Sequence, residues 1–315
     1  MDQEQYFCPI VSDDQQVVWA ANKTLCIYEA GKLVLLADDG HTDTIRGISL
    51  FERDTIATGG EDKQVILWKK TDKWIPVWRF LHSKRIMSVQ FDNAGTLFFA
   101  DKFGEFYTVK PDQTVSLMFG HLSAVSCMYF GGNFLVSADR DEKIRLAKYP
   151  QVEVIESYLF GHKRYVCHLV GDKSGQLVSA GADGRIICWD ISDWEHPKQV
   201  WTVQLEDGPI NSVVFYKNEV YFVRSAEPNT VCILSDGAKS SVVEKKFQIQ
   251  SLHVQGDVLM CIDSESHLHL NVIKDDTLVS IGADVPGVGI SLMKTVHHEN
   301  LDDTSISFKK KRSEG

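Results

Sequence analysis

The sequence predicts an all-β protein: a seven-bladed WD-repeat β-propeller followed by a short disordered C-terminal tail. Three observations predict this fold. A Gly-His or similar pair recurs about every forty residues, the intervening segments look like short strands, and no long segment has the 3.6-residue period of a helix. Because closing a ring of blades removes most exposed sheet edges, we expect strands from the two chain ends to share one blade.

The repeat is marked by His41, His82, His121 and His162. Successive histidines are 41, 39 and 41 residues apart, and each is followed four positions later by a β-branched residue. A WD-repeat blade takes roughly 40 to 45 residues. We therefore expect a propeller over 1–295 and a tail over 296–315, with blades near 2–36, 37–78, 79–118, 119–158, 159–204, 205–245 and 246–295. Rings of six or eight blades stay open as alternatives.

Two repeats carry a nearly complete set of hydrogen-bonding side chains. In each, a Ser or Thr precedes an Asp by four residues and a Trp follows that Asp by six. An Asp in a tight turn can accept a hydrogen bond from the blade's His, while the hydroxyl and the indole extend the network. The predicted sets are His41, Thr58, Asp62 and Trp68, and His162, Ser179, Asp183 and Trp189. In the fourth blade we assign His121, Ser137 and Asp141 to the same network, with Ala147 in the Trp position.

The repeat signature is weak in the third blade and decays after residue 200. Segments 209–215 and 247–254 look like first strands that have lost their Gly-His pair. For the strands that close the ring, our candidates are 7–10 and 289–293.

Composition limits the possible functions. The chain has 33 Lys and Arg against 43 Asp and Glu, a net charge of -10, so any RNA contact must be local or made by a partner. Its seven Cys are scattered without a C-x-x-C pair, which favours buried thiols in a reducing compartment. No membrane span or signal peptide is apparent, so we expect an intracellular protein.

No catalytic or metal-binding motif is found. The G-x-S-x-G, G-x-x-x-x-G-K-[ST] and G-x-G-x-x-G patterns are absent, and Gly287 and Gly289 lack the third glycine that the last pattern needs. His267 and His269 lie on one face of a strand, but without a third ligand we expect them to face solvent and to bind no metal. The sequence therefore favours a non-catalytic binding protein over a propeller enzyme.

The fourth blade is unusually charged. Residues 139–145 carry three acids and three bases, and on a strand Lys143 and Arg145 would point to one side while Ile144 and Leu146 point to the other. Such a cluster is either a binding patch or a solvated face.

A resemblance favours the binding patch. The run 135–145, followed by Tyr149-Pro150, the stretch 155–157 and Gly161-His162, resembles the diagnostic stretch of the non-catalytic WD-repeat subunit of the tRNA (guanine-N7) methyltransferase. In that family the propeller forms a heterodimer with a separate Rossmann-fold methyltransferase. The complex uses S-adenosylmethionine to methylate a guanine in the tRNA variable loop, and the propeller itself holds no cofactor and no catalytic residue.

The resemblance also implies roles for individual residues. Glu142, Lys143 and Arg145 would face the catalytic subunit, with Arg145 as the main ion-pair partner and Arg140 and Asp139 as further candidates. We then expect Arg145→Glu to disrupt assembly without unfolding the propeller. The alternative is a WD-repeat adaptor in a ubiquitin ligase or a chromatin assembly.

The tail ends in four consecutive basic residues, Lys309, Lys310, Lys311 and Arg312. Such a run is a nuclear localisation signal, a phosphate-contacting arm or a solvated terminus. We expect the protein in the nucleus, with the cytoplasm as a second location, and we expect tRNA to be bound mainly through the partner.

Overall fold

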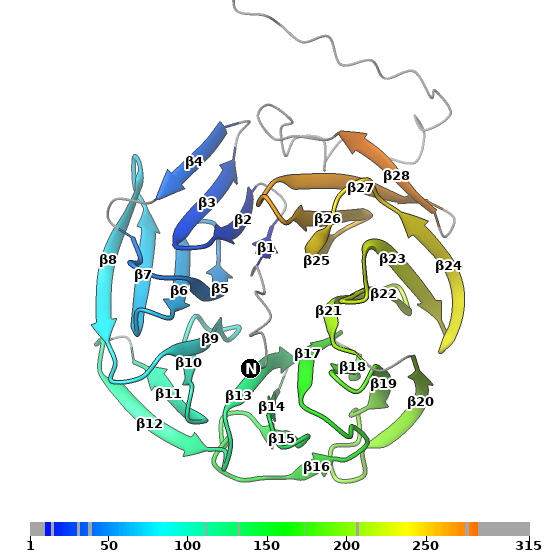
Figure 1. The fold of residues 1–315 in the computed structure, drawn as a ribbon. Helices are drawn as coiled ribbons and strands as arrows, with labels where there is room; N and C mark the ends of the chain where they lie inside the picture. The colour runs from blue at the N-terminus through cyan, green and yellow to red at the C-terminus, as the bar shows by residue number, and fades with distance from the viewer. Residues whose placement is uncertain are drawn as a thin grey trace, which may run out of the picture.

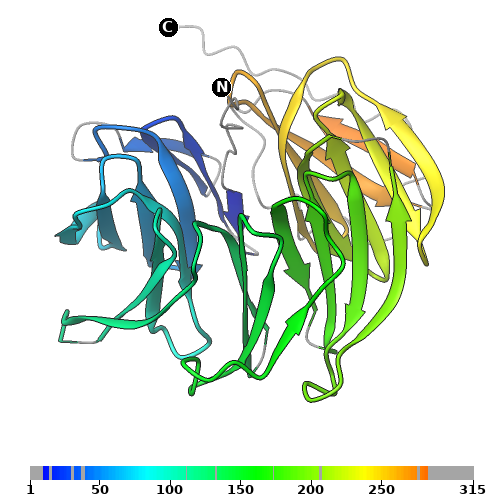
Figure 2. The same ribbon diagram turned by 60° about the horizontal axis from the view of Figure 1, so that its bottom comes forward.

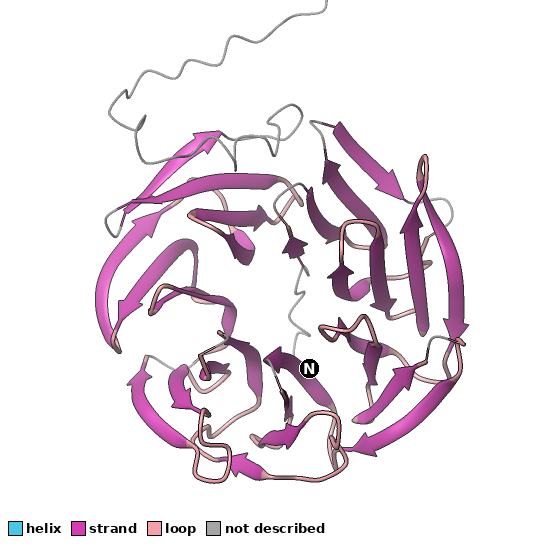
Figure 3. Ribbon diagram, turned by 180° about the vertical axis from the view of Figure 1, so that it is seen from behind, coloured by secondary structure: helices cyan, strands magenta, loops and turns pink. Residues whose placement is uncertain are grey.

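The computed structural model describes residues 10–282, except 14–15, 30–31, 37–39, 111, 132, 173, 206–207 and 275–276. These residues form seven four-stranded antiparallel sheets arranged as a ring around a central axis (Figure 1). Only strands, turns and loops occur among them (Figure 3), so none of the described segments is a helix that could cross a membrane. The prediction of a seven-bladed all-β propeller is confirmed.

Each blade consists of four consecutive strands, ordered from the centre of the ring to its rim. Blades one to four contain β1 (Ile10–Ser12), β2 (Gln16–Ala21), β3 (Thr24–Glu29) and β4 (Lys32–Leu36); β5 (Ile45–Phe51), β6 (Thr55–Gly60), β7 (Gln64–Lys70) and β8 (Trp74–Leu81); β9 (Ile86–Phe91), β10 (Leu97–Asp101), β11 (Glu105–Val109) and β12 (Val115–Gly120); and β13 (Val125–Gly131), β14 (Phe134–Asp139), β15 (Ile144–Lys148) and β16 (Ser157–Leu159). Blades five to seven contain β17 (Val166–Gly171), β18 (Gln176–Gly181), β19 (Arg185–Asp190) and β20 (Lys198–Gln204); β21 (Ile210–Tyr216), β22 (Glu219–Arg224), β23 (Glu227–Ser235) and β24 (Ala238–Glu244); and β25 (Ile249–Gln255), β26 (Val258–Asp263), β27 (Leu268–Lys274) and β28 (Thr277–Gly282).

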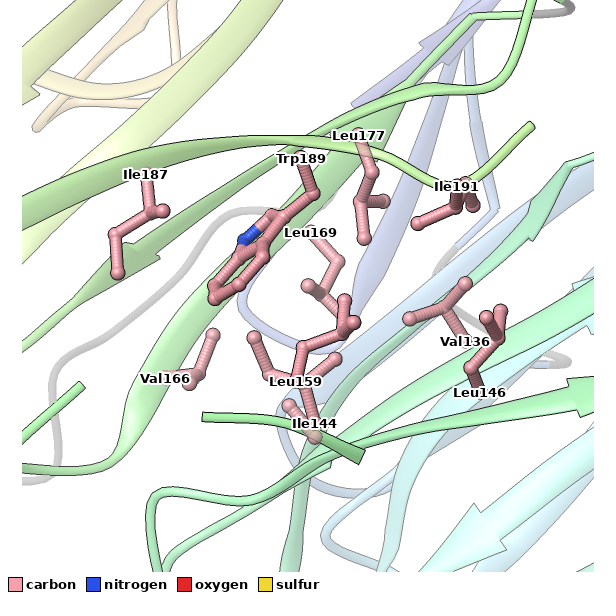
Figure 4. Packing of buried hydrophobic residues seen from close by; sticks show 11 residues of the cluster. Val136, Ile144, Leu146, Leu159, Val166, Leu169, Leu177, Ile187, Trp189 and Ile191 are labelled. Carbon is pink, nitrogen blue, oxygen red and sulfur yellow. The ribbon is translucent and has the colours of Figure 1, made fainter. Parts of the chain in front are cut away.

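The blades pack face to face, so the second strand of each blade is buried on both of its faces, whereas the outer strands are largely exposed. Between blades four and five, Ile144 and Leu146 lie in one cluster with Val166, Leu169 and Trp189 (Figure 4). The second strands are the most completely buried, and in β10 every residue is buried. Burial on both faces explains why the sequence shows continuous apolar runs there and not a simple alternation.

The prediction that the two chain ends share a blade is wrong for the described strands. β1 pairs with β2 of its own blade, and β28 pairs with β27. Of the two candidate closing strands, 289–293 lies outside the described residues, as does all of 7–10 except Ile10. The tail from 296 also lies outside them.

Side-chain packing between blades one and seven closes the described ring. Trp19 and Tyr28 of blade one share an apolar cluster with Met260 and Ile262 of blade seven. The Trp19 indole also donates a hydrogen bond of 3.0 Å to the backbone carbonyl of Ser266. Figure 1 shows these two blades as neighbours. Apolar burial here takes the place of a shared strand.

Backbone hydrogen bonds define one face of the ring, which we call the upper face. In six blades the turn between the second and third strands donates an N–H to the carbonyl of the loop that precedes the first strand. The pairs are Glu61 to Thr44, Lys102 to Arg85, Arg140 to Ala124, Ala182 to Tyr165, Ser225 to Pro209 and Ser264 to Gln248, at 2.8 to 3.1 Å. These turns and loops therefore lie together on the upper face, and Figure 2 gives an inclined view of the blades that present them.

Removing the closing contact should weaken the whole ring. We expect Trp19→Ala to lower the free energy of unfolding by about 3–5 kcal/mol, because it leaves a cavity between blades one and seven and an unpaired Ser266 carbonyl. Urea denaturation followed by far-ultraviolet circular dichroism measures the change. A loss below about 1 kcal/mol would mean that other contacts close the ring.

Candidate partner-binding surface

The predicted networks are formed in blades two and five. In blade two the Trp68 indole donates to Thr58 Oγ1 (2.9 Å), which is 2.8 Å from His41 Nε2, and His41 Nδ1 is 2.9 Å from Asp62 Oδ1. Since an ionised carboxylate only accepts, Nδ1 carries the proton and Nε2 accepts from the hydroxyl. Trp189, Ser179, His162 and Asp183 repeat this relay in blade five, at 2.9, 2.8 and 3.1 Å.

The carboxylates of these networks are ionised although they are largely buried. Burial opposes ionisation of Asp62 and Asp183, but the hydrogen bonds from His41 and His162, together with backbone N–H donors, outweigh it and hold the pKa of each carboxyl below its usual value. The same balance, with His121 as the donor, lowers the pKa of Asp139 in blade four. Blades two, four and five are thus each fixed by a charged hydrogen bond at their upper edge.

In blade four the structural carboxylate is Asp139, so the assignment of Asp141 to the network is wrong. His121 Nε2 bonds Ser137 Oγ at 2.8 Å as predicted, but His121 Nδ1 is 3.0 Å from Asp139 Oδ2. Asp139 Oδ1 also accepts the backbone N–H groups of Asp141 and Lys143. Asp139 is 1% exposed, so its prediction as a partner-binding residue is also wrong. Asp141 is exposed.

A glycine two residues after the Ser or Thr distinguishes the two arrangements. In blades two and five that position is Gly60 or Gly181. A Cβ there would meet the histidine Nδ1 of the blade and, slightly farther away, Asp62 Oδ1 (3.3 Å) or Asp183 Oδ1 (2.5 Å), and at Gly60 also the Thr44 carbonyl at 2.8 Å. The histidine ring and the carboxylate bonded to it therefore lie together in the space that a side chain at this position would need. In blade four the position is Asp139, which supplies the carboxylate itself. This sequence difference was visible and would have identified Asp139.

Because Asp139 supplies the carboxylate that bonds His121, no side chain of the following turn is needed for the hydrogen-bond network of blade four. The fifth residue after the Ser or Thr has a positive φ in the turns of blades two, four and five, at Lys63 (65°), Glu142 (69°) and Gly184 (70°), so the backbone of the turn is alike. Within the described residues, no ion pair is formed by the side chains of Arg140, Glu142 or Lys143. The first two are exposed and Lys143 is half-buried. We call residues 140–143 the blade-four turn.

Arg145 does not belong to this exposed turn, so its prediction as the main ion-pair partner is wrong. It is 3% exposed and points toward blade three, where its guanidinium lies 4.0 Å from the ring centroid of Phe119. Its Nη2 donates to the carbonyl of Val152 at 2.6 Å, and its Nε has no hydrogen-bond partner. Burial lowers the pKa of this guanidinium, but an Arg side chain stays charged in proteins.

Arg145 holds an irregular segment in place. Residues 151–156 form turns and bends between β15 and β16, and Val152 within them is fully buried in the same cluster as Ala147. Blade four thus has Ala147 at the Trp position and Val152 in the same buried cluster, and the Arg145 guanidinium donates a hydrogen bond to the Val152 carbonyl. The contacts of Arg145 with Phe119 and Val152 have no signal in the sequence, because no local pattern links either residue to position 145.

Blades three and seven hold their turns as blade four does, with a carboxylate from the last residue of the second strand: Asp101 and Asp263 each accept the backbone N–H groups two and four residues later. In blade three His82 Nε2 is 3.1 Å from Asp101, and the ring of Tyr107 takes the place of the hydroxyl and indole. In blade seven Asp263 bonds His269 Nε2 at 2.8 Å, so the expectation that His269 faces solvent is wrong. No group of three His, Cys, Asp or Glu in the described residues is arranged to hold a metal ion.

Whether a glycine two residues after the Ser or Thr lets the turn carboxylate reach the histidine can be tested in blade four. Asp139→Ala and Asp139→Gly both remove the carboxylate, but only glycine leaves room for Asp141 to reach His121 as Asp62 reaches His41. We expect Asp139→Gly to be the more stable variant, although glycine in a strand ordinarily costs about 0.5–1 kcal/mol more than alanine. Thermal unfolding compares them, and adding Asp141→Ala should abolish the advantage of glycine. A higher thermal stability of Asp139→Ala than of Asp139→Gly would show that Asp141 does not take over the carboxylate position.

Burial of Arg145 changes the expected outcome of its charge reversal. We expect Arg145→Glu to lose about 3–5 kcal/mol of folding free energy, because it places an unpaired carboxylate beside the Val152 carbonyl. The control is Arg140→Glu in the exposed blade-four turn, which we expect to stay within about 0.5 kcal/mol of the wild type. Urea denaturation measures both. Equal stability of the two variants would contradict the structural role of Arg145.

A family model described as the tRNA methyltransferase TRM82 WD40 domain matches residues 109–278, which include the blade-four turn. A model of the WD domain, G-beta repeat, matches residues 33–69. The Saccharomyces cerevisiae protein named tRNA (guanine-N(7)-)-methyltransferase non-catalytic subunit TRM82 is 32% identical over 48% of this chain and 37% of its own length. The Dictyostelium discoideum non-catalytic subunit wdr4 is 28% identical over 64% of this chain and 49% of its own. The chain thus spans less than half the length of these relatives.

Solved structures support the fold. The WD40 β-propeller domain of Doa1 superposes with a TM-score of 0.69 and 17% sequence identity, covering 86% of this chain and 94% of that domain. The computationally designed protein Ika8 superposes with a TM-score of 0.63 at 16% identity, covering 86% of this chain and 97% of Ika8. At these identities the likeness concerns the fold alone.

Proposed function

The chain belongs to the family of the tRNA methyltransferase TRM82 WD40 domain, and from this we propose that it is a non-catalytic scaffold subunit of a tRNA (guanine-N7) methyltransferase. Its partner in this proposal is a separate Rossmann-fold catalytic subunit, which binds S-adenosylmethionine and methylates guanine in the tRNA variable loop. The names of the relatives, which are non-catalytic subunits, support this division of labour.

The observation that carries the proposal is the exposed blade-four turn. Arg140, Glu142 and Lys143 present both signs of charge on the upper face, and no described side chain neutralises them. Their backbone is fixed by Asp139 and by the hydrogen bond from Arg140 N to Ala124 O. A turn whose backbone is already fixed loses little backbone conformational entropy when it binds, so only its side chains must be ordered. Such a surface suits specific docking to a partner of complementary charge.

Arg145 enters this proposal as a positioning residue and not as a contact. It pairs in the ladder with Ser137 of β14 and Tyr158 of β16, directly behind the turn. By anchoring Val152 it supports the strand that begins at Ile144, immediately after Lys143. Loss of Arg145 would therefore weaken docking indirectly, because it would change the conformation of blade four that holds the turn in place.

The catalytic subunit supplies most of the tRNA contacts in this proposal. The net charge of -10 on this chain disfavours phosphate binding by its surface as a whole. We propose that the scaffold stabilises or activates the catalytic subunit in the nucleus, and also in the cytoplasm. The basic run Lys309, Lys310, Lys311 and Arg312, which supports nuclear import and an auxiliary tRNA contact, lies outside the described residues.

Reversing the charge of Lys143 tests the proposed docking turn. We expect Lys143→Glu to weaken binding of the catalytic subunit by about 2 kcal/mol or more, roughly 30-fold in Kd, and to lower guanine-N7 methylation of tRNA by the reconstituted pair. Isothermal titration calorimetry gives the affinity. Lys23→Glu is the matched control, since Lys23 is an exposed lysine in the corresponding turn of blade one.

Two results would contradict the proposal. One is wild-type affinity of Lys143→Glu for the catalytic subunit together with unchanged methylation. The other is failure of the wild-type chain to bind any guanine-N7 methyltransferase subunit while a ubiquitin ligase or chromatin complex is recovered, which would favour the adaptor function instead.

A further inference from the structure

Two large apolar side chains are exposed on the upper face of blade three, beside the blade-four turn. Leu122, in the loop between β12 and β13, is 95% exposed, and Phe103, in the turn between β10 and β11, is 59% exposed. Single exposed apolar residues are common, but neighbouring ones next to a charged cluster indicate an interaction surface.

Backbone contacts join these residues to the blade-four turn. His121 N donates to Gly104 O at 2.8 Å, which ties the loop of Leu122 to the turn of Phe103. Arg140 N donates to Ala124 O at 3.0 Å, which ties the same loop to the blade-four turn. Lys84 completes the group, because its Nζ lies 3.9 Å from the centroid of the Phe103 ring. We call Lys84, Phe103 and Leu122 the blade-three ridge.

The surroundings of the ridge are basic although the chain as a whole is acidic. In the loops and turns of the upper face of blades three to five, the exposed or half-buried acids are Asp141 and Glu142, whereas the bases are Lys84, Arg85, Lys102, Arg140, Lys143, Lys163 and Arg164. Arg85 is partly neutralised by Glu61 of blade two, at 2.8 Å. A local basic excess on a chain of net charge -10 selects an acidic partner surface.

The chemistry of the ridge favours a protein over RNA as that partner. Single-stranded RNA binds through aromatic rings on which bases stack, but one face of Phe103 is already covered by the Lys84 ammonium. Leu122 has no group that could recognise a base or a phosphate. Asp141 and Glu142 beside the ridge would repel a phosphate backbone, whereas a protein surface can match charges of both signs.

We propose that the docking surface for the catalytic subunit extends from the blade-four turn across the blade-three ridge, with Leu122 as its apolar anchor. This inference rests on the proposed function. The partner presents an acidic surface that contains an apolar pocket: the pocket takes the Leu122 side chain, and the acids around it face Lys84, Arg140 and Lys143. Protein interfaces commonly have a desolvated apolar centre surrounded by a polar rim, which is the arrangement proposed for Leu122 and the charges around it.

The test compares two leucines. Leu122→Ser removes the anchor, and Leu35→Ser is the control, because Leu35 is 58% exposed on β4 of blade one, away from the ridge. Both variants are assayed as full chains, with thermal unfolding to verify the fold. We expect Leu122→Ser to raise the Kd for the catalytic subunit at least tenfold, mainly through faster dissociation, and Leu35→Ser to leave it unchanged.

Measuring Lys143→Glu in the same titration distinguishes a failure of this inference from a failure of the proposed function. If Lys143→Glu weakens binding and Leu122→Ser does not, the ridge is outside the interface and the inference fails, while the function stands. If neither variant changes binding of the catalytic subunit, the inference and the proposed docking turn both fail, because the subunit then binds elsewhere on the chain. A loss of tRNA affinity with unchanged subunit affinity in Leu122→Ser would mean that the ridge contacts RNA, which also overturns the inference.

Discussion

The hydrogen bond between a loop histidine and a carboxylate at or beside the turn between the second and third strands is the interaction on which the upper face of this propeller depends. The sheets are packed on both faces, so a buried polar group at the edge of a blade is stable only when it has a hydrogen-bond partner. His41 with Asp62, His121 with Asp139 and His162 with Asp183 meet this condition with distances near 3 Å. Each bond fixes the turn between the second and third strands relative to the preceding loop.

Blade four keeps this bond but takes its carboxylate from the end of the second strand, whereas blades two and five take it from the following turn. The exposed charges of blade four follow from that difference. Because Asp139 at the end of β14 provides the carboxylate, the turn that follows retains the usual backbone while its side chains are exposed. Arg140, Glu142 and Lys143 are then presented on a rigid support. The presence of Asp139 where blades two and five have a glycine thus leaves the side chains of the next residues free to form the surface that we propose as the docking site.

Arg145 and Trp19 show how packing replaces consensus features elsewhere. Blade four lacks the Trp of the repeat, and a buried guanidinium holds Val152 in the space beside Ala147. Blades one and seven share no strand in the described chain, and Trp19 joins them through an apolar cluster and one hydrogen bond. In both places residues far apart in the sequence supply the contact, so neither solution has a local sequence signal.

The sequence by itself determined the fold, the number of blades and the hydrogen-bond networks of blades two and five. These depend on the repeat of about forty residues and on spacings within one repeat. It also located the charged stretch of blade four. Only the tertiary structure decided which of those charges are exposed. Asp139 and Arg145 look like members of the same cluster in the sequence, but one is turned toward His121 and the other lies against Phe119 of the neighbouring blade. Burial between blades is a property of the ring, and a single repeat does not encode it.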